Sequence, residues 1–167
     1  MSKGKNNKAG TSAAKQPIAK AEMLIRKPVA EVFEAFVNPA ITAKFWFSKG
    51  SGRLEAGQQV TWDWEMYQFS VPVKVKAVEQ NVRILVEWEA YGAPTPIEWI
   101  FKARPDGTTL VSVTNRGFPG SESEAVQHAL DATEGFAFLL AGAKALLEHR
   151  IQLNLVPDRF PDGPGKQ

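Results

Sequence analysis

The residue types that most often carry enzyme chemistry are scarce in this sequence, and their spacing assembles no familiar catalytic site. Only two histidines are present, His128 and His149, and both fall within one predicted helix. At 1.5 Å per residue they would lie about 30 Å apart, too far to share a metal ion. Neither has a recognisable nucleophile and carboxylate beside it. We therefore interpret both as surface or boundary residues of the helix.

Carboxylates occur in the predicted strands at a spacing that could pair them. They alternate with tryptophans, and successive strand residues point to opposite faces of a sheet. We expect them to face solvent and to be neutralised by cations across the strands. A carboxyl group that instead faced inward would have a raised pKa and could act as a general acid or base in a cyclase or dehydratase. The residues concerned are Asp63, Glu65, Glu87, Glu89 and Glu98.

Composition excludes several other kinds of site. The chain has no cysteine, which removes disulfides, thiolate metal ligands and a cysteine nucleophile. The glycine-containing loops at 50–52 and 117–120 lack the lysine and the spacing of a phosphate-binding loop. We expect no metal ion and no cofactor.

Aromatic residues are the most informative side chains. Several of them fall on one face of three predicted strands, and others could close the ends of that face. A buried indole N–H needs a hydrogen-bond partner, so tryptophans gathered in one place indicate either a core with polar contacts or the wall of a ligand pocket. On the strand face lie Trp62, Trp64, Trp88, Trp99 and Phe101, and at its ends Trp46, Phe118 and Phe136.

The elements that would position these side chains can be read from periodicity. Alternation predicts a strand from residue 18 to 25, and apolar spacing of three to four predicts a helix after Pro28 and a short second helix after Asn38. A hairpin succession of strands follows, in which Pro72 is expected at a strand beginning or at a sheet edge. The predicted strands are 52–55, 60–67, 71–77, 84–89, 97–102 and 108–115.

A long helix is predicted from about 122 to 153, capped by Ser121 or Ser123. Its centre holds many small residues, among them Gly135 and Gly142, which indicates either close packing on a sheet or a preserved cavity. The predicted apolar stripe comprises Val126, Leu130, Thr133, Phe136, Leu140, Ala143, Leu147 and Ile151.

The fold class predicted from this order is α+β, with a curved antiparallel sheet of about six to seven strands around the long C-terminal helix. Two short helices follow the first strand. Because the aromatic strand faces and the helix stripe can be buried only against each other, a single core is expected.

Charge and hydropathy are unevenly distributed. Residues 1–20 hold five lysines and no acid, whereas the remainder has a net charge of −3, so the folded body offers no basic face for nucleic acid. We expect a disordered basic tail at 1–17, the folded domain at 18–156 and an irregular tail at 157–167. No apolar run is long enough for a membrane span or a signal peptide, and we expect a cytoplasmic protein.

Three segments resemble one known family. Residues 25–33 (IRKPVAEVF) match its entry from strand to helix, 38–47 its second helix, and NRGF at 115–118 with EGF at 134–136 its last strand and helix. The chain resembles the START-like (SRPBCC) helix-grip superfamily. Within it, the chain is similar to bacterial homologues of the activator of the Hsp90 ATPase, also called polyketide-cyclase-like proteins. It departs at Phe136, where the family commonly has tryptophan, and at 115–116, where a histidine often precedes Gly-Phe.

The resemblance implies an internal pocket between sheet and long helix for a small hydrophobic or aromatic molecule. An enzyme of the cyclase, dehydratase or hydrolase type is the alternative. A third function, regulation of a chaperone ATPase, ranks last, because that activity would require a further N-terminal domain and residues 1–17 lack the apolar residues of a core. The expected ligand-binding residues are Trp46, Trp62, Trp64, Trp88, Trp99, Phe118, Phe136 and Leu140.

Overall fold

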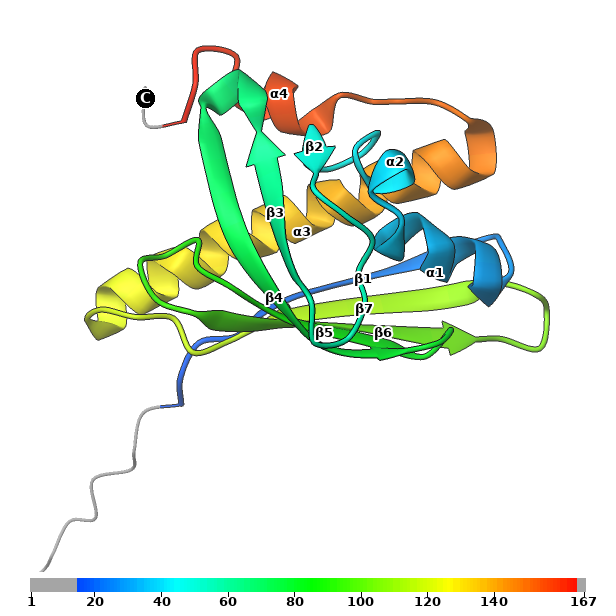
Figure 1. Cartoon of the computed structure of the whole chain (residues 1–167), viewed down its shortest axis with the longest axis horizontal. Coiled ribbons are helices and arrows are strands. Elements are labelled where there is room, and N and C mark those ends of the chain that lie inside the picture. Colours follow the sequence, from blue (N-terminus) through cyan, green and yellow to red (C-terminus); the bar gives the residue numbers. More distant parts are fainter. Residues whose placement is uncertain (1–14, 165–167) are drawn as a thin grey trace, which may run out of the picture.

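A computed structural model describes residues 15–164 and places one curved sheet against one long helix (Figure 1). Seven antiparallel strands are ordered β1-β7-β6-β5-β4-β3-β2. This is the predicted α+β helix-grip fold. The elements in chain order are β1 (Ala19–Ile25), α1 (Val29–Val37), α2 (Pro39–Thr42), β2 (Lys49–Gly50), β3 (Gln59–Trp64), the 3-10 helix η1 (Glu65–Tyr67), β4 (Phe69–Glu79), β5 (Arg83–Trp88), β6 (Thr95–Ala103), β7 (Thr109–Asn115), α3 (Glu122–His149) and α4 (Leu155–Arg159).

Strict alternation in the sequence explains the strands and their inner face. Along β5, β6 and β7 every second residue is buried, and the residues between them face outward. The register aligns these buried positions, since Trp88 lies opposite Thr95 and Ile97 opposite Asn115. The three strands therefore present one continuous apolar surface to the interior, and β3 and β4 curl away from them to form its side wall (Figure 1).

Helix α3 begins with a complete capping box. The Glu124 N–H donates to the Ser121 hydroxyl at 3.3 Å, and the Ser121 N–H donates to the Glu124 carboxylate at 2.7 Å. The helix ends at His149, four residues before the predicted end, because Arg150 adopts a left-handed conformation with φ 57°. The last two apolar residues of the predicted helix, Ile151 and Leu153, are consequently exposed.

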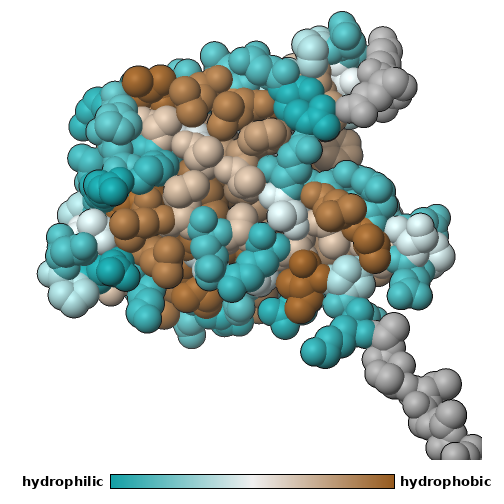
Figure 2. Space-filling view, turned by 180° about the vertical axis from the view of Figure 1, so that it is seen from behind, coloured by the Kyte–Doolittle hydropathy of each residue, from teal (hydrophilic) through white to brown (hydrophobic). Residues whose placement is uncertain are grey.

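The predicted stripe of α3 is wrong in its first half. The buried residues there are Ala125, Ala129 and Ala132, which we call the alanine row, while Val126 and Leu130 are 43% and 60% exposed. Helix α3 packs most extensively on β1, and the buried positions of this half hold alanine, whose short side chain allows a helix to lie close to a strand. Short side chains fit this gap and branched ones do not. Patches of apolar side chains are visible on the rear of the molecule, between hydrophilic areas (Figure 2).

Two predicted strands differ from the structure. Residues 52–55 form no strand, and the short β2 precedes them at Lys49–Gly50. Strand β3 ends at Trp64 because the chain enters η1, which closes with Gln68 in a left-handed conformation. Pro72 lies within β4, one residue before the pairing with β5 begins at Val73, so its missing N–H falls where β4 has a free edge.

The predicted tails at the two ends of the chain differ in how far the structure describes them. The predicted tail at 1–17 falls mainly on residues 1–14, which lie outside the described residues, and it stays a prediction. The expected boundary at 156/157 is crossed by α4, so residues 157–159 are helical and not irregular. Over residues 15–164, no helix is both long enough and apolar enough to cross a membrane.

Candidate functional site

All five tryptophans of the chain gather in the space between the sheet and α3. Trp46, which follows α2, lies at the centre of this tryptophan cluster. Its ring centroid is 4.8 Å from that of Trp62, 5.7 Å from Trp64, 6.1 Å from Trp88 and 5.9 Å from Trp99. Every ring is at most 8% exposed. The tryptophan cluster therefore occupies the interior in which the sequence predicted a pocket.

Three polar atoms on the inner face of the sheet are buried without a hydrogen-bond partner among the described residues. They are the indole nitrogens of Trp88 and Trp99 and the side-chain oxygen of Asn115. Asn115 is fully buried, and its amide nitrogen donates to the Thr95 hydroxyl at 3.0 Å and to the Pro96 carbonyl at 2.8 Å. The side-chain oxygen is thereby fixed in orientation but has no donor. Leaving such a group unpaired costs about 1–3 kcal/mol.

The three atoms come from neighbouring strands, β5, β6 and β7, and from the same face. Trp88 lies opposite Thr95, the residue that accepts from Asn115, while Trp99 lies two residues beyond Ile97, which pairs with Asn115. The face thus offers two hydrogen-bond donors and one acceptor within an apolar wall. That combination is typical of pockets for small amphipathic molecules.

A polar rim borders the tryptophan cluster near the first turns of α3. The Tyr91 ring lies 5.9 Å from Trp88, 5.3 Å from Phe118 and 4.8 Å from His128. Burial, with a smaller contribution from the negative charge of Asp131, raises the pKa of Tyr91 to about 12. The phenol therefore stays protonated at neutral pH and can donate a hydrogen bond.

Tyr91 was not among the predicted site residues, and His128 was expected only at a boundary. His128 is indeed half-buried, but its ring packs on Tyr91. The one signal in the sequence was the position of His128 directly before Ala129, a member of the buried alanine row. Tyr91 comes from the loop after β5, where no periodicity predicts its direction.

All eight predicted ligand-binding residues are buried, but they do not form one group. The five tryptophans meet in the cluster, and Phe118 joins the rim. Phe136 and Leu140 lie on the buried face of α3, at 2% and 0% exposure.

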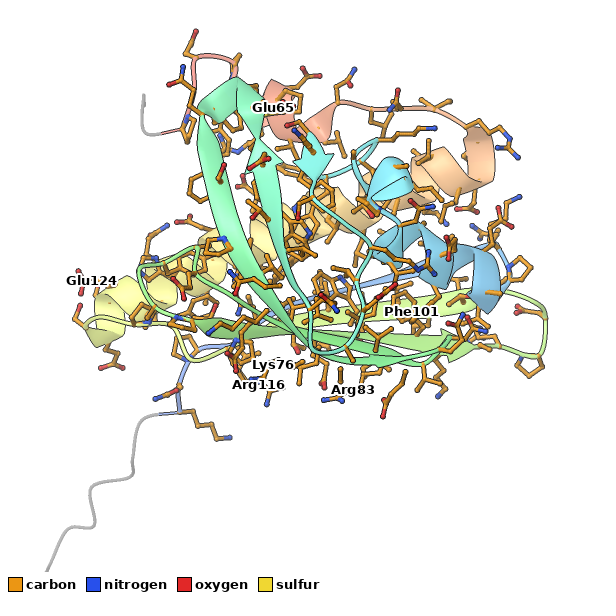
Figure 3. The ribbon with its side chains drawn as sticks, viewed as in Figure 1. Glu65, Lys76, Arg83, Phe101, Arg116 and Glu124 are labelled. Carbon is orange, nitrogen blue, oxygen red and sulfur yellow. The ribbon has the colours of Figure 1, made fainter. Side chains whose placement is uncertain are left out.

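The candidate carboxylates face away from the tryptophan cluster, as predicted. Glu87 pairs with Lys76 at 3.6 Å and Glu98 with Arg83 at 2.6 Å. Figure 3 shows Lys76 and Arg83 on the face of the sheet opposite α3. Glu87 and Glu98 thus neutralise cations across strands, and none of the five candidates is a buried, inward-facing acid or base.

One hollow reaches the tryptophan cluster from outside. It measures about 120 Å³ and is lined by Trp46, Phe47, Gly142 and the segment 152–157, among others. Tyr67 holds that segment, since its hydroxyl donates to the Val156 carbonyl at 2.8 Å. The chain after α3 therefore covers one approach to the aromatic interior.

Comparison with known protein families gives a match over most of the chain. The family described as activator of Hsp90 ATPase homolog 1-like protein matches residues 26–148, from the end of β1 almost to the end of α3. The chain belongs to this family. No curated protein matches the sequence significantly.

Solved structures agree with the assignment to the Hsp90 ATPase activator homologue family. Protein SSP2350 from Staphylococcus saprophyticus is 31% identical, with a TM-score of 0.71 over 82% of this chain and 96% of that one. DynU16, a protein in the dynemicin biosynthetic locus, is 21% identical with a TM-score of 0.70, over 83% of this chain and 49% of its own. The Aha1 dimer from Colwellia psychrerythraea is 17% identical with a TM-score of 0.65, over 79% and 96%. The last two share the fold.

Proposed function

We propose that the protein binds a small aromatic or hydrophobic molecule between the inner face of β5–β7 and α3. The observation that supports this most strongly is the set of three unpartnered buried polar atoms on Trp88, Trp99 and Asn115. Buried polar groups in folded proteins are nearly always satisfied, so a face with three exceptions is matched to something that supplies their partners.

The polar atoms define the chemistry of the ligand. Two indole N–H groups require an acceptor, such as a carbonyl or ether oxygen, and the Asn115 oxygen requires a hydroxyl or amine donor. The surrounding rings favour a flat apolar body. A flat aromatic molecule of a few fused rings that carries both a carbonyl and a hydroxyl group satisfies all these demands.

Entry requires the tryptophan cluster to open. Trp46 is the residue best placed to move, because it comes from the segment after α2 while its four partners are fixed in strands. A ligand that displaced the Trp46 ring would contact the same rings that Trp46 now covers.

An enzymatic role is the second candidate. The carboxylate that it would need does not come from the five acids predicted for it, and the available proton-carrying pair is Tyr91 with His128 at the rim. With its raised pKa, Tyr91 would act as a hydrogen-bond donor to a carbonyl oxygen and not as a base. Chaperone regulation ranks third, since it is supported by the family description alone.

Indole N–H signals in NMR spectra provide the test. The probe is 2-acetylnaphthalene, which carries one carbonyl acceptor, and 2-ethylnaphthalene is the matched probe without it. We expect the acetyl compound to bind more tightly and to shift the indole proton signals of Trp88 and Trp99 more than those of the other three tryptophans.

Two variants separate the hydrogen bonds from ring packing. Trp88→Phe and Trp99→Phe remove an unpartnered N–H, whereas Trp64→Phe removes an indole N–H that is not in that set. We expect the first two to weaken binding of the acetyl compound but not of the ethyl compound. If neither probe binds, and a broader panel of flavonoids, sterols and fatty acids also leaves the indole signals unmoved, the proposal is wrong.

A further inference from the structure

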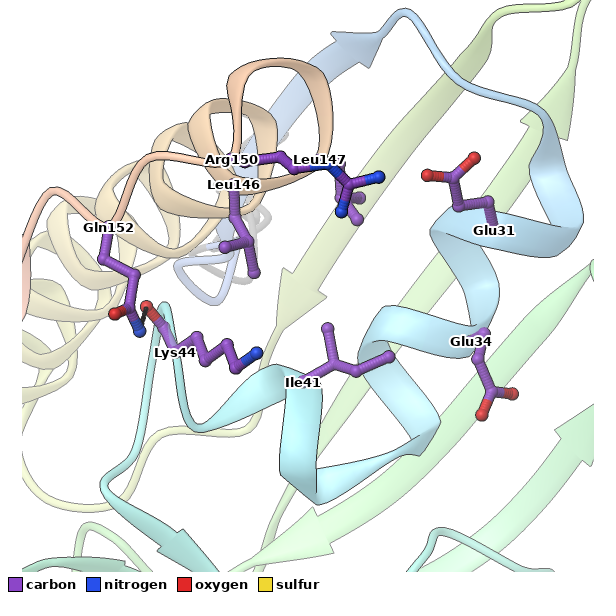
Figure 4. Close-up of a pocket in the computed structure, with 8 residues that line it drawn as sticks. All are labelled: Glu31, Glu34, Ile41, Lys44, Leu146, Leu147, Arg150 and Gln152. Atoms are coloured by element: carbon purple, nitrogen blue, oxygen red, sulfur yellow. Dashed lines mark hydrogen bonds between the residues drawn. The ribbon is translucent and has the colours of Figure 1, made fainter.

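A second and larger hollow adjoins the smaller one, with which it shares Lys44 and Gln152, but it is not lined by any tryptophan. It measures about 440 Å³, within the range of small-molecule pockets. It opens between α1, α2 and the C-terminal end of α3, and we call it the helical cleft (Figure 4). None of the eight predicted ligand-binding residues lines it. Its lining residues are Glu31, Glu34, Ile41, Lys44, Leu146, Leu147, Arg150 and Gln152.

The floor of the helical cleft is apolar. Ile41, Leu146 and Leu147 are partly buried and pack against the core, and they expose their remaining surface to the cleft. A hydrocarbon chain laid on this floor would remove apolar surface of both the floor and the chain from water, which favours binding.

The helical cleft is lined by two glutamates and two cations, which differ in their ion pairs. Each glutamate of the α1 wall has a cation outside the cleft: Glu31 pairs with Lys27 at 3.8 Å, and Glu34 pairs with Arg53 at 2.7 Å. The second carboxylate oxygen of Glu34 accepts from Arg53 at 2.8 Å, so this pair is bidentate. Lys44 and Arg150 on the opposite wall have no ion pair within residues 15–164. The lining is therefore balanced in charge, but because both glutamates already have a cation outside the cleft, Lys44 and Arg150 are the groups left to bind an anion.

The backbone places Arg150 at the mouth of the helical cleft. Arg150 ends α3 in a left-handed conformation, φ 57° and ψ 34°, where helices usually have glycine. Its N–H donates to the Leu146 carbonyl at 2.9 Å. Figure 4 shows its guanidinium beside Leu147, reaching toward Glu31, with the Lys44 ammonium near Ile41. A strained position occupied by arginine is expected where the side chain has a task.

We propose that the helical cleft binds an amphipathic anion with a single carboxylate and an aliphatic chain. The carboxylate sits between Lys44 and Arg150, where a guanidinium can bind it with two hydrogen bonds. The chain lies along Ile41, Leu146 and Leu147. This ligand matches both the two cations without an ion pair and the apolar floor.

Octanoate is the probe, used below its micelle concentration and followed by calorimetry and by NMR of side-chain methyl groups. Octanol and octyltrimethylammonium have the same chain without the negative charge. We expect octanoate to shift the methyl signals of Ile41, Leu146 and Leu147, with affinity at least tenfold above that of both controls.

Variants of exposed residues test the charges without disturbing the core. We expect Lys44→Gln and Arg150→Asn each to weaken octanoate binding several-fold, because asparagine tolerates the left-handed backbone but lacks the charge. Arg150→Lys should keep most of the affinity, and Glu31→Gln should increase it by removing a repelling carboxylate. Lys102→Gln, which removes an exposed cation from β6, is the matched control and should change nothing.

The proposal fails if octanol binds as tightly as octanoate, since the cleft would then select for chain alone. It also fails if Lys102→Gln weakens binding as much as Lys44→Gln, or if octanoate shifts the tryptophan indole signals and leaves the three methyl-bearing residues unmoved. The last result would place the fatty acid in the tryptophan cluster and leave the preceding proposal standing.

Discussion

Two glycines of α3 that look alike in sequence have opposite surroundings. A Cβ atom added at Gly142 would lie 3.1 Å from the Phe45 Cβ and 3.2 Å from the Phe45 backbone oxygen, whereas one added at Gly135 would meet nothing within 4 Å. Close packing therefore explains Gly142. Gly135 destabilises the helix relative to alanine, and no close contact explains why glycine is present there.

We expect Gly135→Ala to raise the free energy of unfolding by about 1 kcal/mol, the usual difference between glycine and alanine in a helix. Gly142→Ala should lower it by about 1–3 kcal/mol, because the Phe45 backbone cannot retreat. Urea denaturation of the two variants measures both changes. Equal effects of the two substitutions would contradict this interpretation of α3.

Tyr91 gives the protein a pH dependence in the alkaline range. Its pKa is raised to about 12 in the folded state, above the value of about 10 in an unfolded chain. The folded state therefore favours the protonated phenol. The resulting stabilisation is complete below pH 10 and is lost as the pH rises toward 12.

Absorbance of the tyrosinate ion measures this titration, since the chain has only two tyrosines. We expect one of the two steps near pH 12, and Tyr91→Phe should remove it. The variant should also lose less stability than the parent protein between pH 10 and 12. Lysine titration is common to both proteins and cancels in the comparison.

At the scale of elements, α4 fastens the chain that follows α3. Tyr67 donates to Val156, Arg159 pairs with Glu134 on α3, and the Tyr67 and Phe160 rings meet at 6.2 Å. These contacts hold the segment 152–157 over Trp46. Breaking them should open the hollow beside the tryptophan cluster.

We expect Tyr67→Phe to speed amide hydrogen exchange in residues 152–160 while the sheet keeps its protection. The lost hydrogen bond should cost about 0.5–1.5 kcal/mol locally. Exchange measured residue by residue provides the readout. Uniform acceleration over the whole chain would mean that α4 supports the domain and does not act as a local cover.

Helix α3 has a buried row of alanines and an exposed row that contains Val126 and Leu130, and substitutions in the two rows should differ in their effect on stability. Ala129 is 7% exposed, and Leu130 is 60% exposed. Leu130→Gln should therefore change the free energy of unfolding by less than about 0.5 kcal/mol. Ala129→Leu should cost about 1–3 kcal/mol by overpacking. Thermal unfolding distinguishes them, and the reverse order would restore the stripe predicted from sequence.

The same helix explains why sequence reasoning succeeds for strands and fails for part of α3. In a strand, one buried residue alternates with one that faces outward, so the inner faces of β5 and β6 could be predicted to the residue. In α3 both the alanine row and the row with Val126 and Leu130 are apolar, and only the distance to β1 decides between them. Likewise, Tyr91 and the helical cleft depend on loops and helix ends, whose directions no periodicity encodes.

At the scale of the molecule, the tryptophan cluster could be predicted in composition but not in arrangement. Four of its members alternate along strands, which fixes their face. Trp46 enters from outside the sheet, and its contacts with all the others depend on how the chain turns after α2. That long-range packing closed the space in which an open cavity was expected.

The lysine-rich residues 1–16 are not expected to contribute to the stability of the domain or to ligand binding. We expect deletion of residues 1–16 to leave the melting temperature and both proposed ligand affinities unchanged, because ordering these polar residues would cost about 1–2 kcal/mol each. Calorimetry on the shortened protein is the measurement. A lower melting temperature would indicate that the lysines contact the body, whose net charge is negative.

Strand β1 is made first but is completed last. Its partner in the sheet is β7, with Ala19 opposite Asn115, and its inner face is covered by α3. While the chain is being synthesised, the hairpins from β3 to β7 can pair with their neighbours as they emerge, but α3 follows them all. The two ends of the domain therefore join only when nearly the whole chain has left the ribosome. Until then β1 is not paired with β7 and α3 does not cover the sheet, so the growing chain has no enclosed space that could hold a ligand.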